Sequence, residues 1–225
     1  MSAAAGPSRR TPRPSLDATI AAYDEVAARY AELFRDSLAG QVLDRAAFTA
    51  FAELVRSSGP GPGPVAEAGC GPGHVTAHLR DLGLDAFGVD LSPAMIAIAR
   101  RTHPGIRFDL GPMDALDAPA GTLGGIVAWY SLIHLPPDEL PRHLAAFHRA
   151  LRPGGCLLLG FFASDAENGP VTGFDHKVAP AHRWPVDALA ALATATGFTE
   201  AGRLRRPPDD GERFPQARLL LRRTA

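Results

Sequence analysis

Apolar residues near the start of the chain recur at steps of three and four, which is the period of one face of an α-helix. The pattern covers residues 15–34 and is repeated over residues 41–56. In the first segment its members are Ile20, Tyr23, Ala27, Tyr30 and Phe34. The run SSGPGPGP at 57–64 then interrupts any regular element. We therefore expect an amino-terminal helical segment that is set apart from the rest of the chain.

After residue 64, short apolar runs alternate with helical patterns. The runs that favour strands are 65–68, 86–90, 106–111, 124–132 and 155–163. Helical patterns come after the first, second and fourth of these runs, at 75–83, 91–104 and 139–155. Strands that alternate with helices in this way form a parallel sheet with helices on both faces.

The last part of the chain departs from this alternation. Residues 183–198 have a helical pattern, whereas 200–206 and 217–223 look like strands joined by a polar, proline-rich loop. Such a connection favours an antiparallel pair at the sheet edge. The expected fold is α/β, a doubly wound seven-stranded sheet that is mostly parallel with an antiparallel edge strand, plus an N-terminal helical lid. The expected divisions are a disordered tail at 1–14, the helical lid at 15–60 and the α/β domain at 61–225.

Composition and charge narrow the possible partners. The chain has 225 residues, 46% hydrophobic and 21% charged, which suffices for one sizeable core. A formal net charge of -1 gives no overall attraction to nucleic acid or to an anionic membrane. Arginines crowd the carboxyl-terminal end, where a solvated strand face is favoured over a local basic patch. They are Arg203, Arg205, Arg206, Arg213, Arg218, Arg222 and Arg223.

Cysteine usage and hydropathy favour a cytoplasmic protein. Cys70 and Cys156 lie in no CxxC spacing and beside no cluster of metal ligands, and a reducing compartment suits them. No apolar stretch approaches the roughly 18 residues of a membrane helix, and the arginine- and proline-rich start lacks the hydrophobic run of a secretory signal. We expect no metal, no nucleic acid and no membrane partner, and a monomer or homodimer.

The stretch VAEAGCGPGHVTAHL at 65–79 is a strand, a glycine loop and the start of a helix. Glycines let the backbone approach a ligand closely, and a helix amino terminus offers N–H groups to anions. Because the loop lies at the carboxyl end of a parallel sheet, a nucleotide ligand is expected. His74 stands where a dinucleotide fingerprint requires its third glycine, and there is no G-x-x-x-x-G-K run elsewhere, so pyrophosphate and P-loop binding are disfavoured.

The E-x-G-x-G-x-G pattern resembles motif I of the class I S-adenosylmethionine-dependent methyltransferases. Asp90 in GVDLS, Asp114 in GPMDALD, the run WYSLIHL and the turn LRPGG match further motifs of that family in order. The resemblance is close over residues 65–163 and implies a Rossmann-like fold with S-adenosyl-L-methionine as cofactor and S-adenosyl-L-homocysteine as product. One departure is Glu67, since the family more often has aspartate there.

The resemblance also implies which residues hold the cofactor. Glu67 would take the methionine ammonium, Asp90 the ribose hydroxyls and Asp114 the adenine amine, while tyrosines of the lid close over the site. The alternatives are a buried carboxylate bonded to the loop for Glu67, a plain strand-end acid for Asp90, and core packing for the tyrosines and methionines. The expected cofactor-binding residues are Tyr23, Tyr30, Glu67, Gly69, Cys70, Gly71, Gly73, His74, Asp90, Leu91, Met95, Met113, Asp114, Trp129, Tyr130 and Ser131.

Methyl transfer is an in-line displacement, so alignment and exclusion of water matter more than a covalent nucleophile. A hydroxyl or acidic carbon still asks for a base. His134, directly after the fourth strand, is the candidate catalytic base, and a loop-anchoring histidine is the alternative. The expected substrate-binding residues are His134, Phe162, His176, His182, Arg183 and Trp184.

The acceptor is expected to be a small molecule. The chain lacks the Pro-Pro-aromatic motif of amino-methylating DNA enzymes, a Pro-Cys nucleophile and a convincing acidic metal site. Methylation of oxygen or nitrogen is favoured and carbon is possible, in bacterial specialised biosynthesis. Two alternatives remain: an NAD-dependent oxidoreductase, opposed by His74 and the lack of a Tyr-x-x-x-Lys pair, and a non-catalytic cofactor-binding sensor or partner protein.

Overall fold

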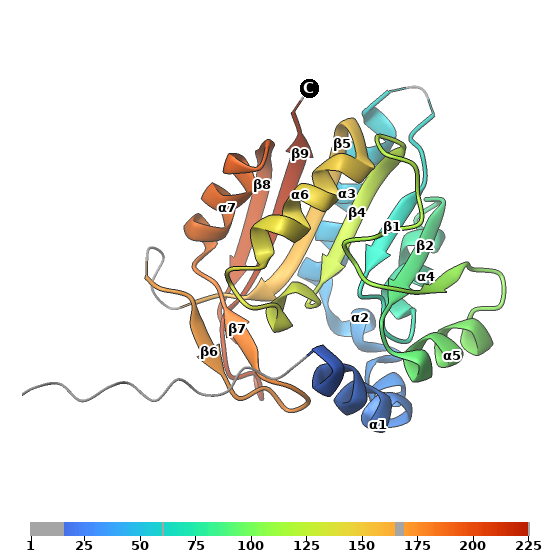
Figure 1. Cartoon of the computed structure of the whole chain (residues 1–225), viewed down its shortest axis with the longest axis vertical. Helices are drawn as coiled ribbons and strands as arrows, with labels where there is room; N and C mark the ends of the chain where they lie inside the picture. Colours follow the sequence, from blue (N-terminus) through green and yellow to red (C-terminus); the bar gives the residue numbers. More distant parts are fainter. Residues whose placement is uncertain (1–15, 60, 165–168, 225) are drawn as a thin grey trace, which may run out of the picture.

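The computed structural model describes residues 16–59, 61–164 and 169–224. The tail predicted at 1–14 lies outside the described residues. A seven-stranded sheet runs through the molecule in the order β3-β2-β1-β4-β5-β9-β8 (Figure 1). The strands are β1 (Val65–Ala68), β2 (Ala86–Asp90), β3 (Phe108–Leu110), β4 (Leu123–Trp129), β5 (Leu151–Phe162), β8 (Phe198–Arg206) and β9 (Gln216–Arg223).

The sheet has the predicted mixture of directions. Strands β1 to β5 are parallel to one another, whereas β9 is antiparallel to both β5 and β8. The strand order reverses between β1 and β4, because the chain first moves outward through β2 and β3 and then returns to the other side of β1. Ligands bind at the carboxyl ends of the strands at such a reversal. The predicted fold class is confirmed.

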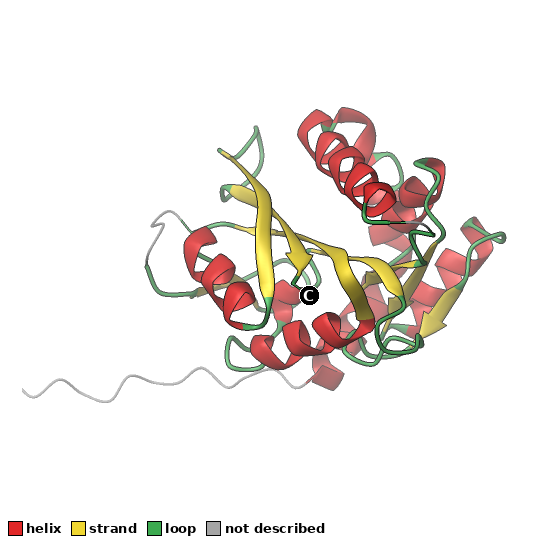
Figure 2. Cartoon of the chain, turned by 90° about the horizontal axis from the view of Figure 1, so that it is seen from above, coloured by secondary structure: helices red, strands yellow, loops and turns green. Residues whose placement is uncertain are grey.

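Helices cover both faces of the sheet (Figure 2). Alternating side chains of each strand point to opposite faces, so Val65 packs in the core under one layer and Ala66 in the core under the other. One layer holds α6 and α7, and the other holds α3 and α4, while α5 packs beside β2 and β3. The helices are α1 (Leu16–Phe34), α2 (Ser37–Gly40), α3 (Val42–Ser57), α4 (His74–Asp81), α5 (Pro93–Thr102), α6 (Leu140–Ala150) and α7 (Val186–Ala195), with a 3-10 turn η1 (Leu132–His134).

Several element boundaries differ from the sequence prediction. The helix expected to reach residue 155 ends at Ala150, and β5 already begins at Leu151, because Pro153 lacks the N–H that a helix interior requires. The helix expected from residue 183 begins at Val186 instead. The residues before it belong to a two-stranded antiparallel hairpin that the sequence analysis did not identify, formed by β6 (Thr172–Phe174) and β7 (Ala181–Arg183).

The expected helical lid at 15–60 is not one unit. Phe48, Phe51 and Val55 of α3 are fully buried against the sheet, so this helix belongs to the core of the α/β domain. Only α1 and α2 lie over the ends of the strands (Figure 1). An amphipathic pattern reports that one face is buried but not what buries it, which is why the two helices looked alike in the sequence. No helix of the described part of the chain is long and apolar enough to cross a membrane.

A buried ion pair fastens α3 to the sheet. Arg218 of β9 is 2% exposed and donates to the Asp44 carboxylate from Nε at 2.9 Å and from Nη2 at 2.7 Å. Its guanidinium also lies over the Trp129 ring, 4.4 Å from the centroid. Arg206, likewise buried, pairs with Glu212 at 2.7 Å. The expectation that these arginines form a solvated strand face is therefore wrong for both, since each has a carboxylate that compensates its burial.

We predict that Asp44→Ala lowers the free energy of unfolding by about 3–5 kcal/mol, because it leaves the Arg218 charge buried and uncompensated. Urea denaturation measures the change. Asp85→Ala, which removes the exposed Arg80–Asp85 pair, is the matched control and should change stability by less than about 1 kcal/mol. The double variant Asp44→Ala/Arg218→Met should recover part of the loss, and equal losses for Asp44 and Asp85 would contradict the assignment.

Candidate functional site

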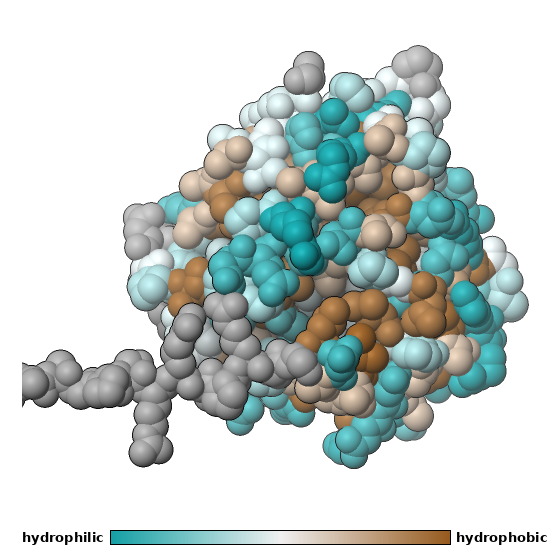
Figure 3. All heavy atoms as spheres, in the orientation of Figure 1, coloured by the Kyte–Doolittle hydropathy of each residue, from teal (hydrophilic) through white to brown (hydrophobic). Residues whose placement is uncertain are grey.

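A cavity of about 430 Å³ opens at the carboxyl ends of β1, β2 and β4, beneath α1. This is the position predicted by the reversal in strand order, and the volume is in the range of small-molecule sites. Its walls combine polar strand ends with apolar side chains, and apolar residues gather on this face of the molecule above α1 (Figure 3). The wall includes Leu16, Thr19, Ile20, Tyr23, Tyr30, Gly69, Gly71, Asp90, Leu91, Ser92, Met95, Pro112, Met113, Asp114, Trp129, Tyr130, Ser131, His134, Leu135, Pro136, Glu139, Arg142 and His143.

The glycine loop needs its glycines for different reasons. All three have positive φ, but a Cβ on Gly69 would come within 2.3 Å of the Ser131 Cβ, and one on Gly73 within 2.6 Å of the Phe108 ring. Gly71 has open space where its Cβ would stand. Gly69 therefore lets β1 and β4 approach, Gly73 lets α4 pack on β3, and Gly71 leaves its backbone open to the cavity.

Asp90 ties the glycine loop to the turn after β2. Its Oδ2 accepts the Gly71 N–H and its Oδ1 accepts the Ser92 N–H, each at 2.8 Å. These bonds fix the carboxylate at the cavity wall and leave further lone pairs for a ligand. Burial raises the pKa of Asp90, and the two backbone N–H groups oppose that rise.

Glu67 is not on the cavity wall. Its side chain is fully buried beneath the glycine loop and accepts a hydrogen bond from the Thr76 hydroxyl of α4. Burial raises the pKa of Glu67 to about 8, against the opposing effect of the Thr76 bond. The side chain therefore links β1 to α4 and is protonated at neutral pH.

Two adjacent residues fasten α1 to opposite rims of the cavity. Asp24 accepts hydrogen bonds from the Ser92 hydroxyl and, at 3.0 Å, from the Ala94 N–H at the start of α5. Tyr23 reaches the other rim, where its hydroxyl lies 2.7 Å from Nε2 of His134 in η1. The helix thus closes the space between the ends of β2 and β4.

The hydrogen bonds of His134 define its tautomer. Nδ1 lies 3.0 Å from the Pro180 carbonyl oxygen, which can only accept, so Nδ1 carries the proton. Nε2 is then the acceptor for the Tyr23 hydroxyl. Burial, together with the nearby His176 and His182, lowers the pKa of His134 to about 4 against the opposing effect of the Pro180 bond, so the ring is neutral at pH 7.

An aromatic cluster lies behind His134 on the side of the β6–β7 hairpin. The His176 ring is 5.3 Å from that of His134 and 6.2 Å from that of Phe162. Phe174 packs on Phe162 at 5.4 Å and on Phe214 at 4.9 Å. These rings contact one another and do not line the cavity. They support His134 from behind.

Tyr130 forms part of the cavity wall in an unusual backbone conformation. Its φ is 54°, in the left-handed region that bulky residues avoid. The hydroxyl donates to the Gln216 side chain, which also accepts from Arg218 at 3.0 Å. Gln216 and Arg218 of β9 therefore hold the Trp129–Tyr130 turn in place.

Asp114, which follows β3, lines the cavity beside α6. Its Oδ2 is 3.1 Å from the Arg142 guanidinium and 3.8 Å from Nε2 of His143, both on α6. Met113 and Met95 also line the cavity. The cavity wall thus includes an acid paired with a cation, and two thioethers. Among the described residues no three His, Cys, Asp or Glu side chains come together as a metal site.

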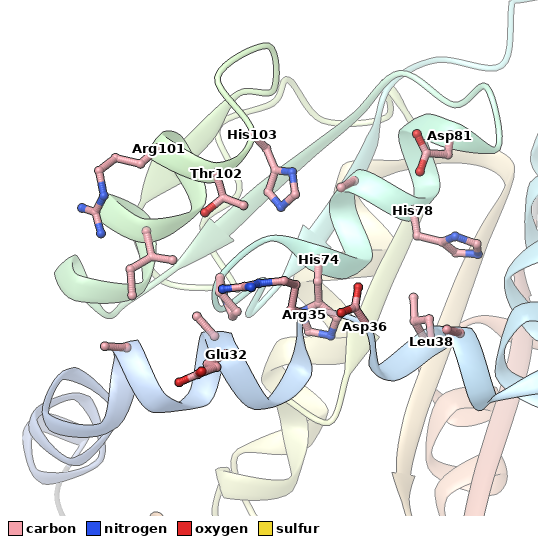
Figure 4. Close-up of a pocket in the computed structure, with 16 residues that line it drawn as sticks. Glu32, Arg35, Asp36, Leu38, His74, His78, Asp81, Arg101, Thr102 and His103 are labelled. Carbon is pink, nitrogen blue, oxygen red and sulfur yellow. The ribbon is translucent and has the colours of Figure 1, made fainter.

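A second cavity, of about 530 Å³, lies on the other side of the glycine loop between α1, α2, α4 and α5. His74 lines this cavity and stacks on Phe34, and Figure 4 shows it projecting from the start of α4 toward the end of α1. Burial lowers the pKa of His74 to about 4. The cavity is larger, but apart from His74 none of the residues expected from the sequence to bind cofactor or substrate lines it.

Comparison with known families agrees with this geometry. A model described as "Methyltransferase domain" matches residues 65–155, the segment from β1 to the start of β5 that contains the glycine loop and Asp90. The chain belongs to the class I S-adenosylmethionine-dependent methyltransferases. The predicted family is confirmed, and the NAD-dependent alternative is not supported.

Curated relatives of this methyltransferase have different names. A malonyl-[acyl-carrier protein] O-methyltransferase of Pectobacterium atrosepticum is 32% identical over 143 residues, which are 59% of this chain and 56% of the relative. A carboxy-S-adenosyl-L-methionine synthase of Chromohalobacter salexigens is 31% identical over 182 residues, 66% of this chain and 65% of the relative. The chain thus spans 56% of the length of the first relative and 65% of the length of the second.

A solved structure shares the fold over almost the whole methyltransferase. The 1,6-didemethyltoxoflavin-N1-methyltransferase of Burkholderia thailandensis, described with bound 1,6-didemethyltoxoflavin and S-adenosylhomocysteine, has a TM-score of 0.67 and 24% identity. The alignment covers 96% of this chain and 93% of that one. At this identity the likeness concerns the fold alone.

Most residues expected to bind the cofactor do line the cavity. The exceptions are Glu67, Cys70, Gly73 and His74. Cys70 packs in a small core with Phe108, away from the cavity. Sequence position places these side chains at the loop but does not say which way each one points.

On the acceptor side, His134 lines the cavity, but the other five residues expected there do not. Phe162 and His176 lie behind His134, and His182 bonds through Nδ1 to the Ile133 carbonyl oxygen at 3.2 Å. Arg183 stacks on Phe214 at 4.3 Å, and Trp184 is buried in the core.

The sequence analysis missed several residues that shape the site. Asp24 does not line the cavity but attaches α1 to its rim through Ser92 and Ala94, and its acidic side chain on the apolar side of the helix was an available signal. Arg142 and His143 of α6 gave no signal, because their position depends on where that helix begins relative to β3.

We predict that Asp24→Ala lowers the free energy of unfolding by about 1 kcal/mol, since it removes a cap from the start of α5. Amide hydrogen exchange in α1 should also become faster, because one of its two attachments is lost. Glu25→Gln, on the exposed side of the same helix, should change neither quantity. Unaltered exchange in Asp24→Ala would show that α1 is held without this contact.

A second prediction concerns Glu67. Because its pKa is raised to about 8, the folded state keeps a proton that the unfolded state releases near pH 4.5. Its stabilising contribution is complete below about pH 4.5 and is lost as the pH rises to about 8. Glu67→Gln should therefore be more stable than wild type at about pH 8.5 and close to it at about pH 5 in urea denaturation. A difference between the two proteins that does not vary with pH would contradict the raised pKa.

Proposed function

We propose that the protein transfers the methyl group of S-adenosyl-L-methionine to a small-molecule acceptor. The observation that carries this proposal is the cavity in which Asp90, fixed by the glycine loop, faces the ends of β1 and β4. When bound there, the cofactor supplies an electrophilic methyl group on a sulfonium ion. The chain's own residues would hold it, align the acceptor and keep water out.

The wall residues fit the parts of this cofactor. Asp90 has free lone pairs for the ribose hydroxyls, and Asp114 lines the same cavity as Met95 and Met113, which can enclose the adenine ring. Gly69, Gly71 and Ser131 border the remaining space, where the amino-acid tail would lie. In this arrangement the predicted ammonium contact of Glu67 would not be direct, because Thr76 takes up its carboxyl group beneath the loop.

The acceptor proposal rests on the apolar mouth of the cavity and on His134. Oxygen or nitrogen is the favoured acceptor atom, carbon is possible, and specialised bacterial biosynthesis is the proposed context. The named relatives include an O-methyltransferase, and the solved structure is an N1-methyltransferase, which agrees with this order. A cytoplasmic location, a monomeric or dimeric state and the absence of nucleic-acid partners remain predictions.

A second candidate is a reaction on the cofactor without methyl transfer. The relative that matches 66% of this chain is named carboxy-S-adenosyl-L-methionine synthase, so a related chain has a different named product. Formation of S-adenosyl-L-homocysteine separates methyl transfer from this candidate and from the non-catalytic sensor, since neither forms it. Conversion of the cofactor to another product separates the second candidate from the sensor, which binds the cofactor unchanged.

We predict that the purified protein binds S-adenosyl-L-homocysteine in calorimetry and does not bind NAD. Asp90→Ala should weaken this binding about 10- to 150-fold, the effect of losing hydrogen bonds to a charged group. Asp117→Ala, whose exposed carboxylate pairs with Arg107, is the control and should bind as wild type does. Radiolabelled methyl transfer to a panel of small acceptors then tests the reaction. Binding of NAD alone would refute the proposal.

A further inference from the structure

The Tyr23–His134 hydrogen bond determines what the cavity offers to an acceptor. The Tyr23 proton is directed to Nε2 of His134, because Nδ1 already carries a proton for the Pro180 carbonyl. The lone pairs of the Tyr23 oxygen are left for a ligand, and both Tyr23 and His134 line the cavity wall. This part of the wall therefore accepts hydrogen bonds and does not donate them.

We infer that Tyr23 and His134 form one proton-accepting pair, and that the acceptor is a hydroxyl or N–H compound that loses a proton when it is methylated. The inference rests on the proposed function and goes beyond it by naming the class of acceptor. Carboxylates and tertiary amines, which have no proton to give up, are excluded as the preferred acceptors.

The step balances in atoms and charge. A lone pair of the acceptor heteroatom forms a bond to the methyl carbon, and the bond between that carbon and sulfur breaks with its electron pair going to sulfur. The acceptor proton passes to the Tyr23 oxygen while the Tyr23 proton passes to Nε2 of His134. Tyr23 ends as it began, and the positive charge that leaves sulfur appears on the imidazole ring.

The surroundings make His134 a base during the reaction and not before it. The titratable groups that face the pair are Tyr30 and Asp90 beside Tyr23, and His176 and His182 beside His134. Burial keeps His134 neutral in the empty cavity, and a bound sulfonium would keep it neutral too, by repulsion. Loss of the sulfonium charge removes that repulsion as the methyl group moves, so proton uptake becomes more favourable along the reaction.

The pair exists only while α1 covers the cavity. Tyr23 belongs to α1 and His134 to η1, 111 residues later, so the bond is made across the cavity mouth. The acceptor must therefore be enclosed by α1 before a base is available to take its proton. This order keeps water, which is itself a hydroxyl compound, from reacting with the methyl donor.

The test compares Tyr23→Phe, His134→Gln and the double variant in single-turnover methyl transfer at saturating cofactor. The probes are catechol, benzyl alcohol, benzylamine, benzoate and dimethylaniline. Gln keeps a hydrogen-bond acceptor for Tyr23 but has no basic nitrogen, so a histidine that only anchors the loop would be replaced without loss. Glu25→Gln on the exposed face of α1 is the control, and cofactor affinity and thermal unfolding are measured for every variant.

We expect wild type to methylate the hydroxyl and amine probes in preference to benzoate and dimethylaniline. Each single variant should lose about 10²- to 10⁴-fold in rate, and the double variant little more, because the two residues act as one unit. With a hydroxyl probe, wild-type activity should fall only as the pH approaches about 4, the pKa of His134. That fall should move to higher pH in Tyr23→Phe, because a hydrogen bond to the neutral ring is lost.

Equal rates for wild type and both single variants would overturn the inference while leaving methyl transfer intact. Preference for benzoate or dimethylaniline would overturn it as well. If wild type binds the cofactor but forms no S-adenosyl-L-homocysteine with any probe, the proposed function fails, and the inference that rests on it fails with it.

Discussion

The hydrogen bonds between the Asp90 carboxylate and two backbone N–H groups, those of Gly71 and Ser92, hold the site together. They join the loop after β1 to the turn after β2, so the two strand ends that face the ligand move as one. Because Asp90 is half-buried at the cavity wall, these donors stabilise its charge and fix the loop against the turn after β2. The cavity, the α1 contacts and the proposed cofactor position all depend on this arrangement.

Other parts of the fold support the opposite wall. The buried Asp44–Arg218 pair connects α3 to β9, and Arg218 in turn lies against Trp129 and Tyr130 at the end of β4. Tyr130 keeps a left-handed backbone there, a conformation that persists only where its surroundings over-determine it. The functional wall thus depends on a helix that the sequence pattern alone had grouped with the lid.

Methyltransferases of this class share a sheet and a glycine loop, whereas their reactions are set by the residues beyond the cofactor. The named relatives illustrate the point, because they include an O-methyltransferase and a carboxy-S-adenosyl-L-methionine synthase. In this chain the space beyond the glycine loop is bordered by Tyr23 and His134. The larger cavity around His74 offers no comparable arrangement of strand-end residues.

The sequence by itself determined the seven strands of the main sheet, the longer helices, the glycine loop and Asp90, because hydrophobic period, glycine spacing and motif order are local properties. Only the tertiary structure decided which way Glu67 and His74 point, since both lie close to the loop in sequence and each turns away from the cavity. It also decided that Tyr23 meets His134. That contact joins residues 111 positions apart, and its geometry depends on how α1 packs across the strand ends, which no local pattern encodes.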